Sequence, residues 1–189
     1  MAHSGQLPPD ASCIPNALPP DAEQKLIRWI DRQPWITDLK RRVQHYGWRY
    51  DYRARHVDLA DDLGPIPNAL RPISKLPDIA KVFDRSPDQI IINEYRPGQG
   101  ISAHVDCEPC FGPVIAALSL GGATDMVFRH RSSDVRYRVR LESRNLLILA
   151  GEARYDWTHE IPARKSDMVN GVRIARNRRL SLTFRTVNL

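Results

Sequence analysis

Long apolar runs are missing from this 189-residue sequence. No run approaches the roughly 20 apolar residues that a membrane-spanning helix needs, which argues against a helical membrane protein. The first 21 residues have neither a basic start nor an apolar stretch, so they do not resemble a secretory signal. We therefore expect a soluble, cytoplasmic protein without a membrane partner.

Cysteine is scarce, with three residues of which Cys13 is far from the other two. Three cysteines do not make a disulfide framework, and their small number agrees with a reducing compartment. Cys107 and Cys110 have C-x-x-C spacing, but no second pair is present to complete a zinc site. We expect free thiols, with a functional disulfide between Cys107 and Cys110 as the alternative.

The sequence also lacks internal repeats and the glycine patterns of dinucleotide-binding and phosphate-binding loops. What it has instead is an excess of positive charge, with a net charge of +6. Phosphates attract clustered lysine and arginine, so this excess favours a polyanionic partner. Many soluble proteins are equally basic, and the charge alone does not identify the partner.

The length suits one domain with a sizeable core, because two domains would each be unusually small. Proline and small residues without a hydrophobic period predict an irregular arm over residues 1–20. Residues 21–189 then form the single domain, which we expect to be monomeric. Apolar residues at helical spacing predict helices over residues 21–33 and 75–84.

Short β-rich runs follow one another after residue 88. Runs of this length, separated by glycine, proline, serine or charged residues, predict a sandwich or barrel with antiparallel pairing. The expected fold class is mainly β with bracing helices. The seven runs are Gln89–Tyr95, Val114–Leu120, Asp125–His130, Val135–Leu141, Asn145–Leu149, Asp156–Ile161 and Arg179–Val187.

Two histidines and one aspartate form the first candidate site. His104 and Asp106 lie two residues apart, so on a strand both side chains point to the same face. His159, arriving from another segment, would complete one face of an octahedron and leave three positions open. Such a triad suits an Fe(II) ion that must bind a co-substrate and oxygen side by side. A surface turn or an ordinary hydrogen-bonded pair is the alternative.

The last predicted strand carries a second pattern. Arg179, Ser181, Thr183 and Arg185 share one face, while Leu180, Leu182 and Phe184 share the other. If the apolar face packs on the domain, both arginines point inward, and buried arginines need anionic partners. A dicarboxylate would satisfy both, whereas arginines on an edge strand would simply face solvent.

Residues 89–95 add a third alternation, with Asn93 and Tyr95 on one face. An amide and a phenol suit the recognition of a carboxylate, although ordinary hydrogen bonding within a strand is the alternative.

Four separated motifs together resemble the AlkB family of Fe(II)- and 2-oxoglutarate-dependent dioxygenases. The resemblance covers roughly residues 30–189 and is specific because the motifs occur in the family's order. They are Asn93-Glu94-Tyr95-Arg96-Pro97-Gly98, then Gly100-Ile101 through His104-Val105-Asp106, then His159, and finally Arg179-x-Ser181-x-Thr183-Phe184-Arg185.

This resemblance implies a double-stranded β-helix, or jelly roll, over about residues 88–189, with a recognition lid over about residues 41–75. His104, Asp106 and His159 would hold Fe(II). Arg179 with Tyr95 would bind the distal carboxylate of 2-oxoglutarate. Its other end, which chelates the iron, would lie near Arg185 and Asn93, while Ser181 stands where the founding member has asparagine.

The aromatic and basic stretch over residues 41–55 falls where the family places its lid. Alternating aromatic residues there favour a strand or hairpin in which Gly47 permits a bend. Trp48 or Tyr50 could stack on a nucleotide, or these rings could cover the core. Glu108 lies two residues after Asp106, where AlkB relatives place an acid near the base; a solvent-facing acid is the alternative.

The resemblance implies an enzyme that uses Fe(II), 2-oxoglutarate and O2 to demethylate alkylated nucleobases in DNA or RNA, releasing succinate, CO2 and formaldehyde. A tRNA-modification hydroxylase or a protein demethylase on the same fold is the alternative. A non-catalytic nucleic-acid-binding jelly roll would have little reason to keep three ligands and two buried arginines.

Overall fold

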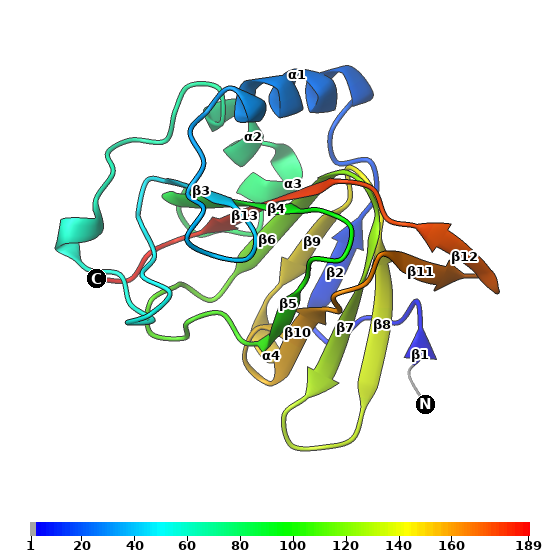
Figure 1. The fold of residues 1–189 in the computed structure, drawn as a ribbon. Helices are drawn as coiled ribbons and strands as arrows, with labels where there is room; N and C mark the ends of the chain where they lie inside the picture. The colour runs from blue at the N-terminus through cyan, green and yellow to red at the C-terminus, as the bar shows by residue number, and fades with distance from the viewer. Residues whose placement is uncertain (1–2) are drawn as a thin grey trace.

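The computed structural model describes residues 3–189, whose strands form two sheets that face each other (Figure 1). The larger sheet has six strands in the order β2-β9-β6-β13-β4-β3. All neighbouring strands in it are antiparallel. They are β2 (Ala11–Ile14), β9 (Leu146–Leu149), β6 (Ile115–Gly121), β13 (Arg179–Arg185), β4 (Gln89–Tyr95) and β3 (Val43–Tyr46).

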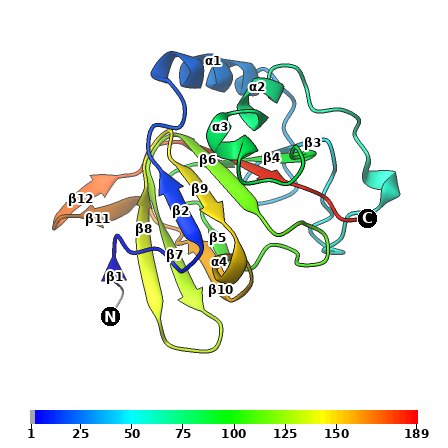
Figure 2. The same ribbon diagram turned by 180° about the vertical axis from the view of Figure 1, so that it is seen from behind.

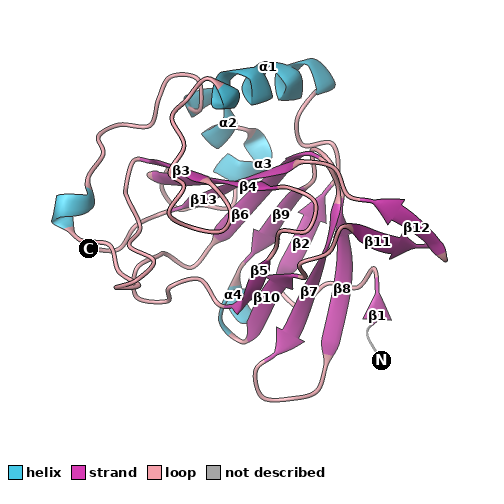
Figure 3. Ribbon diagram, viewed as in Figure 1, coloured by secondary structure: helices cyan, strands magenta, loops and turns pink. Residues whose placement is uncertain are grey.

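The smaller sheet has five strands in the order β1-β8-β7-β10-β5, antiparallel except that β1 runs parallel to β8. A separate hairpin of two strands projects beside it (Figure 3). The sheet consists of β1 (His3–Ser4), β8 (Arg136–Leu141), β7 (Thr124–His130), β10 (Trp157–Ile161) and β5 (Ile101–His104). The hairpin consists of β11 (Ser166–Val169) and β12 (Val172–Ala175).

Three helices cover the outer face of the larger sheet, as the reverse view shows (Figure 2). They are α1 (Pro20–Asp31), α2 (Arg71–Ser74) and α3 (Pro77–Ala80). A fourth helix, α4 (Gly151–Tyr155), joins β9 to β10, and a 3-10 turn spans Leu59–Asp61. None of the helices in residues 3–189 has both the length and the apolar character needed to cross a bilayer.

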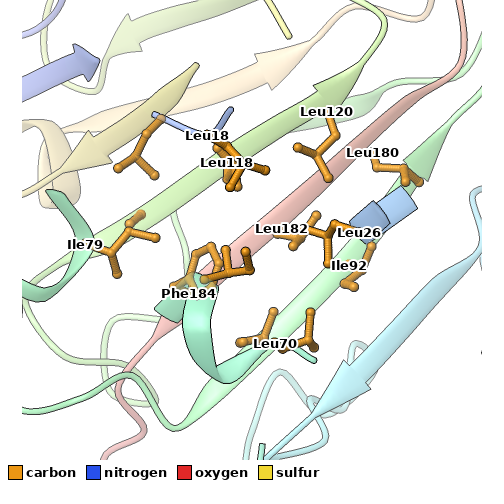
Figure 4. Packing of buried hydrophobic residues seen from close by; sticks show 14 of the residues in the cluster. Leu18, Leu26, Leu70, Ile79, Ile92, Leu118, Leu120, Leu180, Leu182 and Phe184 are labelled. Atoms are coloured by element: carbon orange, nitrogen blue, oxygen red, sulfur yellow. The ribbon is translucent and has the colours of Figure 1, made fainter. Parts of the chain in front are cut away.

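The alternation of β13 divides the interior into two parts. Leu180, Leu182 and Phe184 are buried against the helices in the first apolar cluster (Figure 4). Because successive side chains of a strand point to opposite faces, Arg179 and Arg185 lie on the face that looks toward the smaller sheet. A second apolar cluster lies between the two sheets. The predicted division of this strand into two faces is confirmed.

The predicted fold class, mainly β with bracing helices in a jelly-roll core, is confirmed. Each of the seven predicted runs forms a strand, with ends that differ by no more than two residues. Strand β5 was not among them, because four residues with a mixed burial pattern give little alternation. The same reason explains why the β11–β12 hairpin was not predicted.

The irregular arm predicted for residues 1–20 is wrong in part, and residues 1 and 2 lie outside the described residues. His3 and Ser4 form β1, which pairs with β8. Residues Ala11–Ile14 form an edge strand that pairs with β9 along its whole length. A four-residue strand between proline-rich segments has too little pattern to be recognised, and its pairing partner lies more than 130 residues away. The helix predicted over residues 75–84 is also shortened to α3, because Pro77 begins it.

The aromatic stretch is a strand only at its start. Strand β3 ends at Tyr46, and Gly47 follows with a φ of 77°. A Cβ atom there would collide with the carbonyl of Asp88, so both the turn and the close packing require glycine. Residues 48–58 then run as a loop with isolated bridges, among them Asp51 to His56. The predicted bend is confirmed, whereas the hairpin is not formed.

Replacing Phe184 by alanine should destabilise the protein strongly. Its ring is fully buried between β13 and the helices, and a large-to-small change there leaves a cavity. We expect a loss of about 3–5 kcal/mol in the free energy of unfolding, measured by urea denaturation. The control Leu63→Ala removes a side chain that is 52% exposed and should change it by less than about 0.5 kcal/mol. Equal effects of the two changes would contradict this packing.

Candidate functional site

The pairing of β5 with β10 brings the predicted triad together. His104 and His159 are direct partners in the antiparallel register, so their imidazoles share one face, with ring centroids 4.3 Å apart. Asp106 follows two residues after the end of β5. One ligand atom from each of the three residues lies within 4.8 Å of the other two. The sequence therefore predicted which residues meet at this point.

Asp106 is held as an anion by the opposite sheet. Burial alone would raise the pKa of its carboxyl, but Arg185 and the two histidines hold that pKa well below its usual range. The Nη2 atom of Arg185 donates a hydrogen bond of 2.7 Å to Oδ1 of Asp106. The second carboxylate oxygen remains available for a metal ion.

His159 presents the neutral ring that binds metals, and His104 presents one ring nitrogen. Burial, reinforced by the nearby charge of His104, lowers the pKa of His159 to about 4. In His104 the Nδ1 atom lies 2.8 Å from the carbonyl oxygen of Ser102. Because a carbonyl only accepts, Nδ1 carries the proton and Nε2 is left as the ligand atom.

Arg179 is a buried cation whose hydrogen bonds are incomplete. Its guanidinium is 2% exposed and lies 5.5 Å from the ring centroid of Tyr95, its direct partner across β13 and β4. Nη2 donates to Ser119 Oγ at 2.7 Å and makes a longer contact of 3.5 Å to Ser181. Nε and Nη1 have no partner. A buried guanidinium with free donors is suited to a carboxylate ligand.

A cavity of about 650 Å³ lies between the two sheets. Its wall includes the triad and four side chains from the larger sheet, Asn93, Tyr95, Ser181 and Arg185. Tyr50 and Tyr52 of the loop after β3 line it too, with their rings edge to face at a centroid distance of 5.1 Å. A metal ion held by the triad and a ligand stacked on the tyrosines would therefore bind in one cavity.

Of the other predicted residues, Asn93 lines this cavity, whereas Trp48 and Glu108 lie outside its lining. Asn93 Oδ1 accepts a hydrogen bond of 2.8 Å from Arg41 Nε, and Asn93 pairs with Ser181 rather than lying beside Arg185. Trp48 packs on the apolar cluster between the sheets, and its carbonyl accepts from Gln89. Glu108 forms an ion pair of 3.0 Å with Arg131.

Glu108 and Arg131 line a second cavity, of about 460 Å³. This second cavity shares Arg55, Val105, Asp106 and Cys107 with the wall of the first. Glu108 therefore faces a space next to the triad, rather than the space that holds it.

Arg154 supports the triad without being predicted. This α4 residue is 2% exposed, and its Nη1 and Nη2 atoms donate to the backbone carbonyls of Asp106 and Cys107 at 3.0 and 3.1 Å. A single arginine thus holds the turn that carries Asp106. Gln89, which accepts from Arg185 at 3.1 Å, and Ser119 were missed for the same reason: nothing in the local sequence reveals a partner from a distant segment.

The expectation of free thiols is wrong for two of the three cysteines. Cys107 and Cys110 form a disulfide, with Cα atoms 5.3 Å apart, and only Cys13 is free. Residues 108–110 form a turn, which brings the two sulfur atoms together directly after the triad. Both sulfur atoms also lie within 3.5 Å of the carbonyl oxygen of Arg55 in the loop after β3.

The donor set fits a known class of metal site. Two imidazoles and one carboxylate around open positions are the ligands of non-haem Fe(II) oxygenases. The unpaired donors of the buried Arg179, whose strand neighbour Tyr95 lines the cavity, suit an anionic ligand. A profile of the 2OG-Fe(II) oxygenase superfamily matches residues 10–185. The chain belongs to this superfamily.

Relatives place this oxygenase among the AlkB-like proteins. "Alkylated DNA repair protein ALKBH8 homolog" of Arabidopsis thaliana is 36% identical over 95% of the chain, which spans 58% of that protein. "tRNA (carboxymethyluridine(34)-5-O)-methyltransferase ALKBH8" of Mus musculus is 37% identical over 86% of the chain, which spans 26% of that protein. The chain thus spans from about a quarter to about half of these relatives.

Another relative matches along most of its own length. "Uncharacterized protein L905" of Acanthamoeba polyphaga mimivirus is 38% identical over 93% of the chain and 84% of its own length. Among solved structures, "The structure of OsALKBH1" superposes with a TM-score of 0.73 at 20% identity, covering 96% of this chain and 98% of that chain. At that identity the superposition shows a shared fold.

The oxygenase therefore depends on Fe(II), 2-oxoglutarate and O2, as its superfamily does, and His104, Asp106 and His159 fit the iron. Iron supplies the redox chemistry that couples the oxidation of 2-oxoglutarate to that of a second substrate. The chain supplies two imidazoles, the carboxylate anion of Asp106 and the buried guanidinium of Arg179.

His45 contacts the two tyrosines of the cavity. Its Nδ1 accepts from the backbone nitrogen of Tyr50 at 3.3 Å, and its Nε2 lies 3.3 Å from the Tyr52 hydroxyl. Burial, together with the positive charges of Arg185 and Arg49, lowers the pKa of His45 to about 4. The folded protein thus keeps this imidazole neutral, which lets Nδ1 accept.

Acidification should lower the free energy of unfolding through His45. Between about pH 6.5 and about pH 4 the unfolded chain binds a proton that the folded imidazole rejects, so acidification favours unfolding. We expect the free energy of unfolding to fall more steeply over this window in the intact protein than in His45→Gln. Urea titrations at several pH values measure the difference. Parallel curves would show that His45 does not titrate in this way.

Proposed function

We propose that the protein hydroxylates an alkyl group on a modified base of a nucleic-acid strand. The observation that carries this proposal is the wall of the cavity: the edge-to-face pair of Tyr50 and Tyr52 lines the same cavity as the triad and the cationic side chains of Arg41 and Arg55. Aromatic rings stack on bases, and arginines neutralise the phosphates that accompany them.

In this proposal the smaller sheet and the segment after it hold the iron, and the larger sheet binds the co-substrate. His104, Asp106 and His159 hold the iron, and Arg185 keeps Asp106 ionised and correctly oriented. Arg179 donates its free Nε and Nη1 to the distal carboxylate of 2-oxoglutarate. The protein contributes to catalysis by positioning the iron and 2-oxoglutarate, because the metal supplies the oxidative chemistry.

Three more residues complete the co-substrate site in this proposal. Tyr95 and Ser181 flank Arg179 at the distal carboxylate, while Asn93, fixed by Arg41, faces the end that chelates the iron. Burial raises the pKa of the Tyr95 hydroxyl, which therefore stays protonated and can donate a hydrogen bond to a carboxylate.

For the base itself, Tyr50 is the stacking residue that reaches the cavity. Trp48 packs on the apolar cluster and thereby anchors the loop that carries Tyr50. Glu108 lines the adjoining cavity, where its carboxylate can accept a hydrogen bond from an exocyclic amine of a base. The buried co-substrate site and the rings of Tyr50 and Tyr52 exclude water from the reacting centre. We infer that residues 21–189 act as one domain and that the chain works as a monomer.

Transfer RNA is the favoured strand in this proposal, because the mouse relative, at 37% identity, carries a name that specifies a tRNA uridine. Alkylated DNA is the second candidate, favoured by the name of the Arabidopsis relative. The chemistry separates them: an N-linked methyl group is lost as formaldehyde after hydroxylation, whereas a carbon-linked group retains the new hydroxyl.

The test is succinate formation from 2-oxoglutarate with Fe(II) and O2, in the presence of total tRNA or of methylated DNA and RNA oligonucleotides. We expect stimulation by at least one of these substrates and no turnover in His104→Ala, which lacks a metal ligand. The control His130→Ala removes an imidazole that is hydrogen-bonded only to nearby serines and should retain activity.

The products distinguish the candidate reactions. Formaldehyde indicates demethylation, and a base heavier by one oxygen atom indicates stable hydroxylation. Slow consumption of 2-oxoglutarate that no nucleic acid stimulates would contradict a nucleic-acid substrate and favour a protein. No succinate from iron-loaded protein under any condition would contradict the oxygenase reaction itself.

A further inference from the structure

Three exposed cations lie on segments that contact one loop beside the cavity. The loop of residues 96–100, between β4 and β5, holds them together: Gln99 Nε2 donates to the carbonyl of Lys40 at 2.6 Å, and the nitrogen of Gly98 donates to the carbonyl of Arg164 at 2.9 Å. Lys165 follows Arg164 directly before the projecting hairpin (Figure 1). We call Lys40, Arg164 and Lys165 the basic rim.

One residue of the basic rim lines the cavity, and the other two follow a segment that packs against it. Lys40 lines the cavity, and so do Gly100 and Ile101 at the end of the same loop. Gly100 packs so closely on the backbone of residues 161–163 that a Cβ there would collide with it. The segment that carries Arg164 and Lys165 is therefore fixed against the wall of the cavity.

The charges of the rim are unpaired. No described residue gives the side chains of Lys40, Arg164 or Lys165 a hydrogen bond or an ion pair. Neighbouring arginines differ in this respect, because Arg42 and Arg96 both contact the buried carboxylate of Glu94. Three uncompensated charges around one loop create a positive potential at the entrance.

We propose that the basic rim binds the phosphate backbone of the polynucleotide whose base enters the cavity. This inference rests on the proposed function and adds the surface that would select a strand over a free nucleoside. Lysine and arginine at such a position neutralise phosphates and release counterions, so they give affinity without reading sequence.

Arg55 adds a further positive charge at the cavity. This residue is exposed and lines both the cavity and its neighbour, where Arg131 is ion-paired with Glu108. A strand that crosses from the rim toward Arg55 places one base above Tyr50 and leaves the next nucleotide over the second cavity. The phosphates on both sides of the target base then meet positive charge.

The experiment measures binding of a fluorescein-labelled, unmodified RNA oligonucleotide by anisotropy over a range of salt concentrations. The rim variant carries Lys40→Ala, Arg164→Ala and Lys165→Ala. The control carries Arg28→Ala, Arg32→Ala and Lys75→Ala, which remove equal charge from exposed positions on the helical side. Both variants should bind 2-oxoglutarate as the intact protein does, which verifies folding.

We expect the rim variant to bind RNA about tenfold more weakly, and the slope of log K against log salt to fall by about 2, or 0.7 for each lost phosphate contact. The control should bind almost as the intact protein does. Unchanged binding by the rim variant, or equal weakening in the two variants, would overturn the inference.

Two further results distinguish failure of the basic rim from failure of the proposed function. If the intact protein does not bind RNA but still oxidises a modified nucleoside monophosphate, the rim is not a phosphate site and base oxidation stands. If it binds RNA through the rim and oxidises no base, the surface stands and the proposed reaction fails.

Discussion

The hydrogen-bonded ion pair between Arg185 and Asp106 joins the two sheets at the centre of the site. Arg185 ends β13 of the larger sheet, and Asp106 follows β5 of the smaller one, so the 2.7 Å contact fixes one sheet against the other. Loss of one partner would leave the other as a buried charge, which is strongly unfavourable. The metal triad and the co-substrate pocket therefore depend on one another.

Strand β13 explains why a fold with this core can keep cations inside. Its apolar face, with Leu182 and Phe184, is fully buried against the helices, and this burial stabilises the strand that carries Arg179 and Arg185 on its other side. The unpaired donors of Arg179 cost stability in the ligand-free protein. In the proposed co-substrate site, an anion bound to these donors would offset that cost.

Local patterns predicted the parts of the site that depend on local geometry. The period of two placed Arg179 with Arg185, because alternation on a strand is independent of what it packs against. Asp106 lies beyond the end of β5, so its short separation from His104 along the chain, and not strand alternation, keeps these two residues close. Arg154 and Ser119 could not be found in this way, since their partners come from distant segments. The Cys107–Cys110 disulfide depends on the turn of residues 108–110, which spacing alone does not reveal.

Calorimetric titration of 2-oxoglutarate into the anaerobic, Fe(II)-loaded protein tests most directly whether the two sheets build one joint site. The account predicts one 2-oxoglutarate per chain, weaker binding without metal, and a loss of about tenfold to a hundredfold in Arg179→Met, which removes the charged donors. The control Arg173→Met, on exposed β12, should bind normally. Binding that is indifferent to both the metal and Arg179 would contradict the account.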